Sequence, residues 1–173
     1  MPSLWIIDGF NLVRQSRDLM ELEAKDLSQA KLALLGRLQH FSQVSGEKVL
    51  CVWDATGSIN SRRVEEPHGT VVFLYTKAFE TADEAIMELA SDKKAAAIVV
   101  SSDREILEAA RKAGSATMKS EAFDQVLFRM QQPGFEREEP EGFDPKRGTK
   151  KKGPSHRRPK VERKVHSKLR KIF

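Results

Sequence analysis

The stretch that decides the fold is Leu-Trp-Ile-Ile-Asp at residues 4–8, four apolar residues that end at an acid. A short, continuous apolar run of this kind is typical of a strand buried on both faces of a parallel sheet. Gly9 and Asn11 come directly after the run and favour a tight polar turn beneath a ligand. The first predicted strand therefore delivers the carboxylate of Asp8 to one end of a sheet.

Strand-like and helix-like segments alternate along the rest of the chain. Apolar runs predict further strands over residues 48–53, 71–75, 97–100 and 116–118. Helices are predicted to begin after Asp26, after Thr81, after Asp103 and at Ser120. The polar stretch 56–69, which contains glycines and a proline, is predicted to be a loop. This alternation predicts an α/β fold, a Rossmann-like three-layer sandwich with a mainly parallel sheet.

Charge is divided unevenly between the body of the chain and its C-terminal end. Residues 146–173 contain 13 Lys and Arg and one acid, whereas the residues before them contain 17 Lys and Arg and 24 Asp and Glu. Proline, glycine and charged residues dominate from Gly134 onward. We therefore expect a domain over 1–133 and then a linker and basic tail over 134–173, partly disordered, that grips a polyanion.

The end of the basic tail has a helical pattern. An apolar stripe with spacings of four, four and three residues predicts a helix over 160–173; its members are Val161, Val165, Leu169 and Ile172. On RNA or a ribosomal surface, the basic face of this helix would meet phosphates, and the stripe would meet a protein or the domain itself. A helix lying on a membrane is disfavoured because the stripe is narrow and poor in aromatic residues.

Acidic residues follow four of the predicted strands. Three strands end in an aspartate and the fourth is followed by two acids; these residues are Asp8, Asp54, Asp103, Glu80 and Asp83. We expect them to converge, because the carboxyl ends of parallel strands share one edge of a sheet. Gathered like charges require a bound cation or shared protons, and oxygen ligands favour Mg²⁺ or Mn²⁺. Such an ion activates water and neutralises phosphodiester charge, which predicts hydrolysis of a nucleic acid.

Each acid also has a simpler structural interpretation. An aspartate between a strand and a helix is a common N-cap, which suits Asp103, and the helix dipole favours any acid at the position of Asp83. Asp54 suits the start of a turn. Asp8 is harder to explain by capping alone, because it comes straight after a buried apolar run. The coincidence of all four favours a functional site.

Four short blocks resemble, in the same order, the motifs of the NYN domains, a branch of the PIN-like nucleases. They are Ile-Ile-Asp-Gly-Phe-Asn-Leu at 6–12, Val-Trp-Asp-Ala at 52–55, Glu-Thr-Ala-Asp-Glu at 80–84 and Val-Ser-Ser-Asp-Arg-Glu-Ile at 100–106. The YacP-like ribonucleases are the branch that the blocks resemble most, and the resemblance runs over roughly residues 4–130. Phe10 stands where this motif often has tyrosine, and the basic extension lies outside the pattern.

The resemblance implies a PIN-like sheet and metal-dependent cleavage of RNA at Asp8, Asp83 and Asp103, which would be both catalytic residues and metal ligands. It also implies support from Asn11 and Asp54. Glu80 is added as a supporting residue because it follows a predicted strand. The candidate RNA contacts are Arg62, Arg63 and Arg104 in the domain, and Lys150, Lys151, Lys152, Arg157 and Arg158 in the tail.

Other acid-bearing α/β proteins fit the sequence less well. A haloacid dehalogenase phosphatase needs a second aspartate where this chain has Phe10, and a receiver domain needs adjacent acids where it has Gly9. A non-catalytic RNA- or ribosome-binding module, with its acids kept for structure, is the alternative from another class. A DNA-directed nuclease is a third interpretation.

The favoured interpretation is a cytoplasmic, metal-dependent ribonuclease, more specifically an endonuclease, that acts on mRNA, tRNA or rRNA and uses its tail to bind RNA or the ribosome. A membrane partner is not expected, because no apolar run is long enough to span a bilayer and the N-terminus has no basic leader region. Cys51 is the single cysteine, which excludes an internal disulfide and a cysteine-based zinc site.

Overall fold

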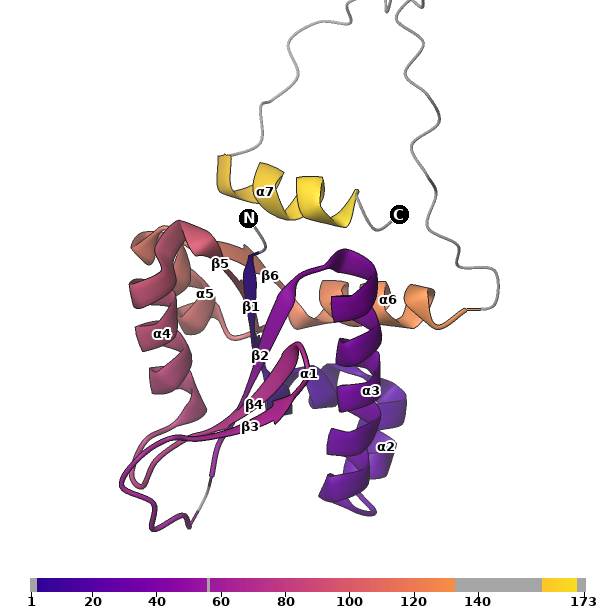
Figure 1. The fold of residues 1–173 in the computed structure, drawn as a ribbon, viewed down its shortest axis with the longest axis vertical. Coiled ribbons are helices and arrows are strands. Elements are labelled where there is room, and N and C mark those ends of the chain that lie inside the picture. The colour runs from indigo at the N-terminus through magenta and orange to yellow at the C-terminus, as the bar shows by residue number, and fades with distance from the viewer. Residues whose placement is uncertain (1–2, 56, 133–159, 171–173) are drawn as a thin grey trace, which may run out of the picture.

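A six-stranded sheet is the middle layer of the computed structural model, which describes residues 3–55, 57–132 and 160–170 (Figure 1). The strands are β1 Leu4–Asp8, β2 Lys48–Trp53, β3 Val64–His68, β4 Val71–Tyr75, β5 Ala97–Val100 and β6 Ala116–Met118. Their order across the sheet is β3-β4-β2-β1-β5-β6. All neighbouring strands are parallel except the edge pair β3 and β4. The predicted α/β sandwich with a mainly parallel sheet is confirmed.

Helices cover both faces of the sheet, as crossover connections between parallel strands require. They are α1 Gly9–Gln15, α2 Arg17–Glu23, α3 Leu27–Ser45, α4 Ala82–Lys93, α5 Arg104–Ala113, α6 Ser120–Met130 and α7 Lys160–Leu169. Asp26, Thr81 and Asp103 cap the helices that the sequence predicted to follow them. Figure 1 shows α4 and α5 on one side of the sheet and α1, α2, α3 and α6 on the other.

The sheet separates two hydrophobic cores, because alternate side chains of each strand point to opposite faces. Trp5 points into the larger core, where its ring lies 4.9 Å from Phe41 and 5.2 Å from Phe123, measured between centroids. Ile6, the next residue of β1, points into the smaller core and packs near Ile86 of α4. β5 is buried along its whole length and β1 at all but its first residue, which is why these central strands read as apolar runs.

Two local predictions were wrong. The segment after Asp8 is not a tight turn but the start of α1, and α2 follows at Arg17. The predicted loop over 56–69 contains β3, which pairs antiparallel with β4. β3 has the sequence Val-Glu-Glu-Pro-His and is mostly exposed, so it lacks the apolar pattern by which the buried strands were found.

Helix α7 packs onto the amino end of the sheet, away from the strand ends that carry the acids (Figure 1). Val165 is buried in the larger core and Leu169 packs against it, so these two members of the apolar stripe meet the domain itself. Lys168 pairs with Glu47, just before β2, and Lys164 donates to the carbonyl of Ala95, just before β5. The disorder predicted between 134 and 159 lies outside the described residues.

No helix in the described ranges is both long and apolar enough to cross a membrane.

Candidate active site

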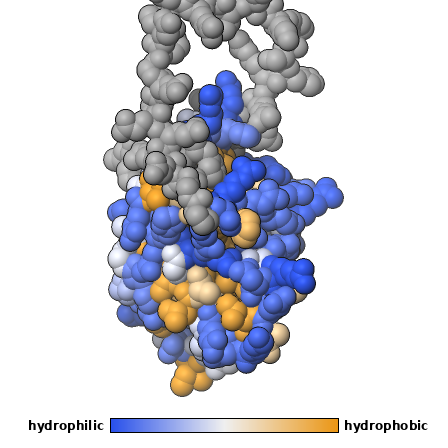
Figure 2. Space-filling model, turned by 90° about the vertical axis from the view of Figure 1, so that its right-hand side faces the viewer, coloured by the Kyte–Doolittle hydropathy of each residue, from blue (hydrophilic) through white to orange (hydrophobic). Residues whose placement is uncertain are grey.

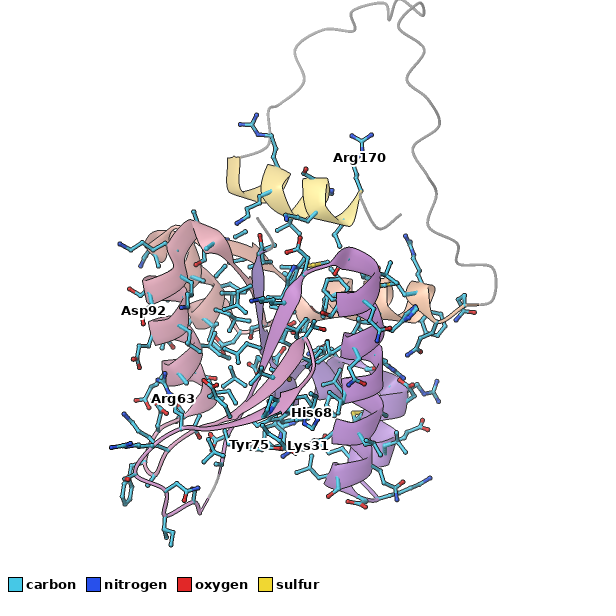
Figure 3. The ribbon with its side chains drawn as sticks, in the orientation of Figure 1. Lys31, Arg63, His68, Tyr75, Asp92 and Arg170 are labelled. Atoms are coloured by element: carbon cyan, nitrogen blue, oxygen red, sulfur yellow. The ribbon has the colours of Figure 1, made fainter. Side chains whose placement is uncertain are left out.

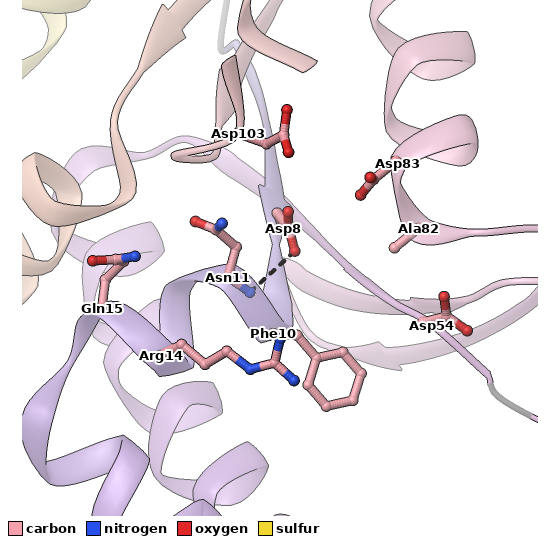
Figure 4. A pocket seen from close by; sticks show the side chains of 9 residues that line it. All are labelled: Asp8, Phe10, Asn11, Arg14, Gln15, Asp54, Ala82, Asp83 and Asp103. Atoms are coloured by element: carbon pink, nitrogen blue, oxygen red, sulfur yellow. Dashed lines mark hydrogen bonds between the residues drawn. The ribbon is translucent and has the colours of Figure 1, made fainter. Parts of the chain in front are cut away.

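A pocket of about 410 Å³ lies at the carboxyl edge of the sheet (Figure 4). Its lining residues come from β1, α1, the start of α4 and the loops after β2 and β5; they are Asp8, Phe10, Asn11, Arg14, Gln15, Asp54, Ala82, Asp83 and Asp103. The four aspartates predicted to converge therefore line one pocket. Figure 4 shows the side chains of Asp8, Asp83 and Asp103 around the same space, with Asp54 at its side.

Asp8 is the most buried of the four aspartates, with 7% of its surface exposed. Its Oδ1 accepts a hydrogen bond from the backbone N–H of Asn11 at 3.1 Å, and its Oδ2 accepts one from Oγ of Ser101 at 3.2 Å. Burial raises the pKa of Asp8 to about 6, the two hydrogen bonds oppose that rise, and the charges of Asp83 and Asp103 add to it. This carboxylate is thus held in place but incompletely compensated.

Asp83 and Asp103 are more exposed and stand at the starts of two helices. Asp83 lies in the first turn of α4, between Thr81 and Glu84, the two residues that form the capping box of this helix. Burial raises the pKa of Asp83, with further contributions from Asp103 and Asp54. Asp103 is the N-cap of α5, and its Oδ1 accepts from two backbone N–H groups at 2.7 and 3.3 Å. Asp103 therefore caps a helix and also faces the acidic pocket.

Asn11 holds together the elements around the pocket. Its side-chain oxygen accepts a hydrogen bond from the backbone N–H of Ser102 at 2.9 Å and another from Oγ of Ser120 at 2.7 Å. These bonds tie α1 to the loop after β5 and to the start of α6. Ser101, which sequence reasoning did not select, donates to Asp8 and accepts from the N–H of Asp103 at 3.1 Å. Its signal was available: a polar residue directly after the buried strand β5.

The close approach of α1 to β2 sets the position of the pocket. A Cβ atom on Gly9 would lie 2.8 Å from the indole of Trp53, so a larger residue would push helix and strand apart. Phe10 packs edge-on against the same indole, 5.2 Å between ring centroids. The guanidinium of Arg14 lies 5.7 Å from the centre of the Phe10 ring. Arg14 is the one cation among the described lining residues, and sequence reasoning did not select it, whereas Phe10 was noted as a position suited to stacking or packing.

Other residues predicted for the site lie outside the pocket. Arg63 binds Glu80 through two nitrogens and also contacts Glu88, so Arg63 and Glu80 brace each other beside α4 (Figure 3). Arg104 donates to Glu108 at 2.8 Å on the exposed face of α5. Arg62 is exposed in the loop before β3. The tail candidates Lys150, Lys151, Lys152, Arg157 and Arg158 lie outside the described residues.

The chemistry of the pocket fits a hard divalent cation. It offers four carboxylates, and the pKa values of Asp8 and Asp83 are raised by burial and, in part, by the charges of neighbouring acids that include Asp103. Among residues 3–55, 57–132 and 160–170, however, no three Asp, Glu, His or Cys side chains are arranged as a complete metal site. Asp8, Asp83 and Asp103 are the residues of the pocket that could hold a divalent cation.

Comparison with known families places this chain, with its parallel sheet, among the NYN domains, which are a nuclease family. The chain belongs to the YacP-like NYN domain family, whose model matches residues 5–173. Sequence reasoning had ended the resemblance near residue 130 and set the basic extension outside it. The match corrects that boundary, in agreement with the packing of α7 onto the sheet.

Relatives in Bacillus subtilis support this placement. The uncharacterized protein YacP of strain 168 is 28% identical over 85 residues, which are 49% of each protein. The chain thus spans about half the length of the curated relative that it matches. A crystal structure of Rae1 (YacP) from B. subtilis superposes with a TM-score of 0.62 at 24% identity, over 76% of both chains. A point mutant of Rae1 gives a TM-score of 0.62 at 22% identity, over 75% of this chain and 77% of its own.

Proposed function

We propose that this protein is a metal-dependent ribonuclease, acting as an endonuclease, that hydrolyses RNA phosphodiester bonds at the acidic pocket. The observation that carries the proposal is the meeting of four aspartates, delivered by separate elements, in one pocket of a nuclease-family fold. Such a cluster is unfavourable without a counter-charge, and folds of this type place their reactive groups at this edge of the sheet.

Asp8, Asp83 and Asp103 are the residues that would hold Mg²⁺ or Mn²⁺, with Asp54 adding negative potential from the side. When bound, the ion would lower the pKa of a water molecule and neutralise charge on the scissile phosphate. Asp8 is the central ligand in this proposal, because its carboxylate is the most buried of the four and a bound cation would compensate its charge most. Ser101 and Asn11 hold its two oxygens in a fixed direction.

The pocket that the substrate would enter is lined by a cation and an aromatic ring as well as by acids. Arg14 offers a positive charge to an RNA phosphate at the mouth of the pocket, and Phe10 offers an apolar face beside it. The tail lysines and arginines between 146 and 158 are proposed to bind the RNA backbone at a distance from the pocket. A ribosomal surface is the proposed larger partner, because it presents the same polyanion to the same charges.

Cleavage of a long single-stranded RNA, with and without added Mn²⁺, tests the proposal directly. We expect cleavage by the parent protein and its loss in Asp8→Asn, while Asp92→Asn cleaves at the parental rate. Asp92 is a matched control because it is an exposed aspartate near the far end of α4 (Figure 3). A circular RNA that is opened by the parent protein would establish endonucleolytic cutting.

The alternative is an RNA-binding module whose acids serve only structure. The capping bonds of Asp103 favour this alternative, since they account for that residue without catalysis. RNA binding by the parent protein without metal-stimulated cleavage would select the alternative. Equal cleavage by the parent and Asp8→Asn would instead reject the proposed catalytic site.

A further inference from the structure

Two loops beside the acidic pocket are joined into one projecting structure, called here the paired loops (residues 57–63 and 76–81). Asp54 precedes the first loop, Ala82 follows the second, and both of these residues line the pocket. Thr76 ties the base, where its Oγ1 accepts from the N–H of Ala55 at 3.0 Å. Nearer the tip, the N–H of Ala78 donates to the carbonyl of Asn60 at 2.8 Å. The paired loops form the lower end of the molecule in Figure 1.

Phe79 lies in the second of the paired loops, fully exposed and with a backbone conformation that is unusual for a phenylalanine. The N–H of Glu80 donates to the carbonyl of Lys77 at 3.2 Å, closing a turn in which Phe79 is the third residue. Phe79 has a φ of 62°, the left-handed value that a type II turn requires there and that glycine or asparagine normally supplies. Its side chain is also fully exposed, as is that of Ile59 in the neighbouring loop.

The strained turn is held by a largely buried charge pair between Arg63 and Glu80. The carboxylate of Glu80 is 7% exposed; it accepts from Arg63 at 2.6 Å and from the backbone N–H of Lys77 at 3.2 Å. Arg63 also contacts Glu88 of α4, which fixes the turn to the body of the domain. An exposed aromatic ring is therefore presented on a rigid support. Strain retained at a braced surface position is a recognised mark of functional sites.

The surroundings of Phe79 match a nucleic acid. Arg62 and Lys77 are both exposed within the paired loops; Glu80, the acid of these loops, is bound by Arg63 at 2.6 Å and lies 3.9 Å from the ammonium of Lys77, which leaves the lysine on the surface. Aromatic rings flanked by cations bind single-stranded nucleic acid, because every base has a face that stacks and every phosphate a charge. The lower extremity of the space-filling view is likewise hydrophobic (Figure 2).

We propose that the paired loops are a base-stacking platform that guides single-stranded RNA into the acidic pocket. Phe79 stacks on an unpaired base, Ile59 widens the apolar surface, and Arg62 and Lys77 contact phosphates on either side. The platform rests on the proposed ribonuclease function and names its substrate class as unpaired RNA. A paired strand fits poorly, since its bases are already stacked on one another.

The test measures binding and stability separately in the full-length protein. Binding of a fluorescent single-stranded 12-nucleotide RNA is followed in EDTA, so that cleavage does not interfere. Phe79→Gly is expected to weaken binding about tenfold, as loss of one stacked base does. The same change is expected to raise the melting temperature, because glycine accepts the left-handed φ. Phe79→Trp retains binding, and Phe128→Gln, which alters a half-exposed phenylalanine on α6, leaves binding unchanged.

A 2-aminopurine base in the same RNA reports stacking directly, and its quenching by the parent protein is expected to be lost in Phe79→Gly. Equal RNA affinity and equal quenching for the parent and Phe79→Gly would overturn the platform while leaving the ribonuclease proposal intact. This is the result expected if Phe79 instead contacts a protein partner. A parent protein that neither binds nor cleaves RNA would instead overturn the proposed function, and the platform with it.

Discussion

The ammonium nitrogen of Lys168 lies 2.5 Å from a carboxylate oxygen of Glu47, and this pair joins α7 to the beginning of β2. Glu47 is almost fully buried, and its other oxygen accepts from the backbone N–H of Ser3, just before β1. One carboxylate therefore connects three segments that are far apart in the sequence. Together with buried Val165, this pair makes α7 part of the domain.

Removing the charge of Lys168 should destabilise the whole domain. In Lys168→Met the buried carboxylate of Glu47 loses its cation, so we expect a loss of about 1–3 kcal/mol in the free energy of unfolding. The matched control is Arg17→Met, which breaks an exposed pair with Glu21 and should change stability by less than about 0.5 kcal/mol. Chemical denaturation measures both; equal effects of the two changes would show that α7 is not held by this pair.

Gly9→Ala should disturb both the fold and the site. The new methyl group would meet the indole of Trp53 at 2.8 Å, and the resulting shift of α1 should cost about 1–3 kcal/mol and reduce cleavage. Gly36→Ala is the control, because no atom lies within 4 Å of its added Cβ on α3. That change should stabilise the protein by about 0.5–1 kcal/mol. If Gly9→Ala is as well tolerated as Gly36→Ala, the contact with Trp53 does not constrain the site.

The stability of the metal-free protein should depend on pH through Asp8. The folded pKa of about 6 exceeds the ordinary value of 3.8, so folding favours the protonated form. The favourable contribution is complete below about pH 4 and is lost as pH rises through 6. At pH 7 we expect Asp8→Asn to be more stable than the parent by about 1–3 kcal/mol, and the two to converge near pH 4.

Thermal melts in EDTA between pH 3.5 and 8 measure this difference. A difference between parent and Asp8→Asn that stays constant over the range would contradict the raised pKa. Added Mn²⁺ should stabilise the parent more than Asp8→Asn, because the ion supplies the missing counter-charge.

The basic tail should be tested by neutralising charges and not by truncation. Deleting residues 146–173 would also remove α7 and expose the core around Val165. Replacing the five tail cations with glutamine should instead weaken RNA binding and lower its salt dependence by about 0.7 per lost contact. These residues are Lys150, Lys151, Lys152, Arg157 and Arg158. Titrations at several salt concentrations give the slope, and an unchanged slope with unchanged melting temperature would exclude the tail from RNA binding.

Buried parallel strands were predictable from the sequence because burial on both faces of a sheet requires apolar residues at consecutive positions. The runs at 4–8, 48–53 and 97–100 are apolar except for Asp8 and Lys48 at their ends, and the structure gives strands with these bounds. Helix starts were predictable where a capping side chain stands, as at Asp26 and Thr81. The convergence of the aspartates followed from topology alone, since parallel strands end together.

The parts that escaped prediction depend on contacts between distant residues. Gly9 is the first residue of α1 although glycine has a poor helix propensity. A glycine is needed there because Trp53 leaves no room for a side chain. Arg63 was expected to contact RNA, and its binding to Glu80 depends on how two loops fold together. Phe79 carries no sequence signal, because its exposure and left-handed backbone appear only in the folded turn.

The edge strand β3 has a consequence for association between molecules. An open sheet edge invites a strand from a second chain, and proteins prevent this with proline and with charged side chains. β3 carries Pro67 together with Glu65 and Glu66, all three of them exposed. At the opposite edge, β6 is in contact with α7. Both borders of the sheet are thus protected against the addition of a strand from a second chain.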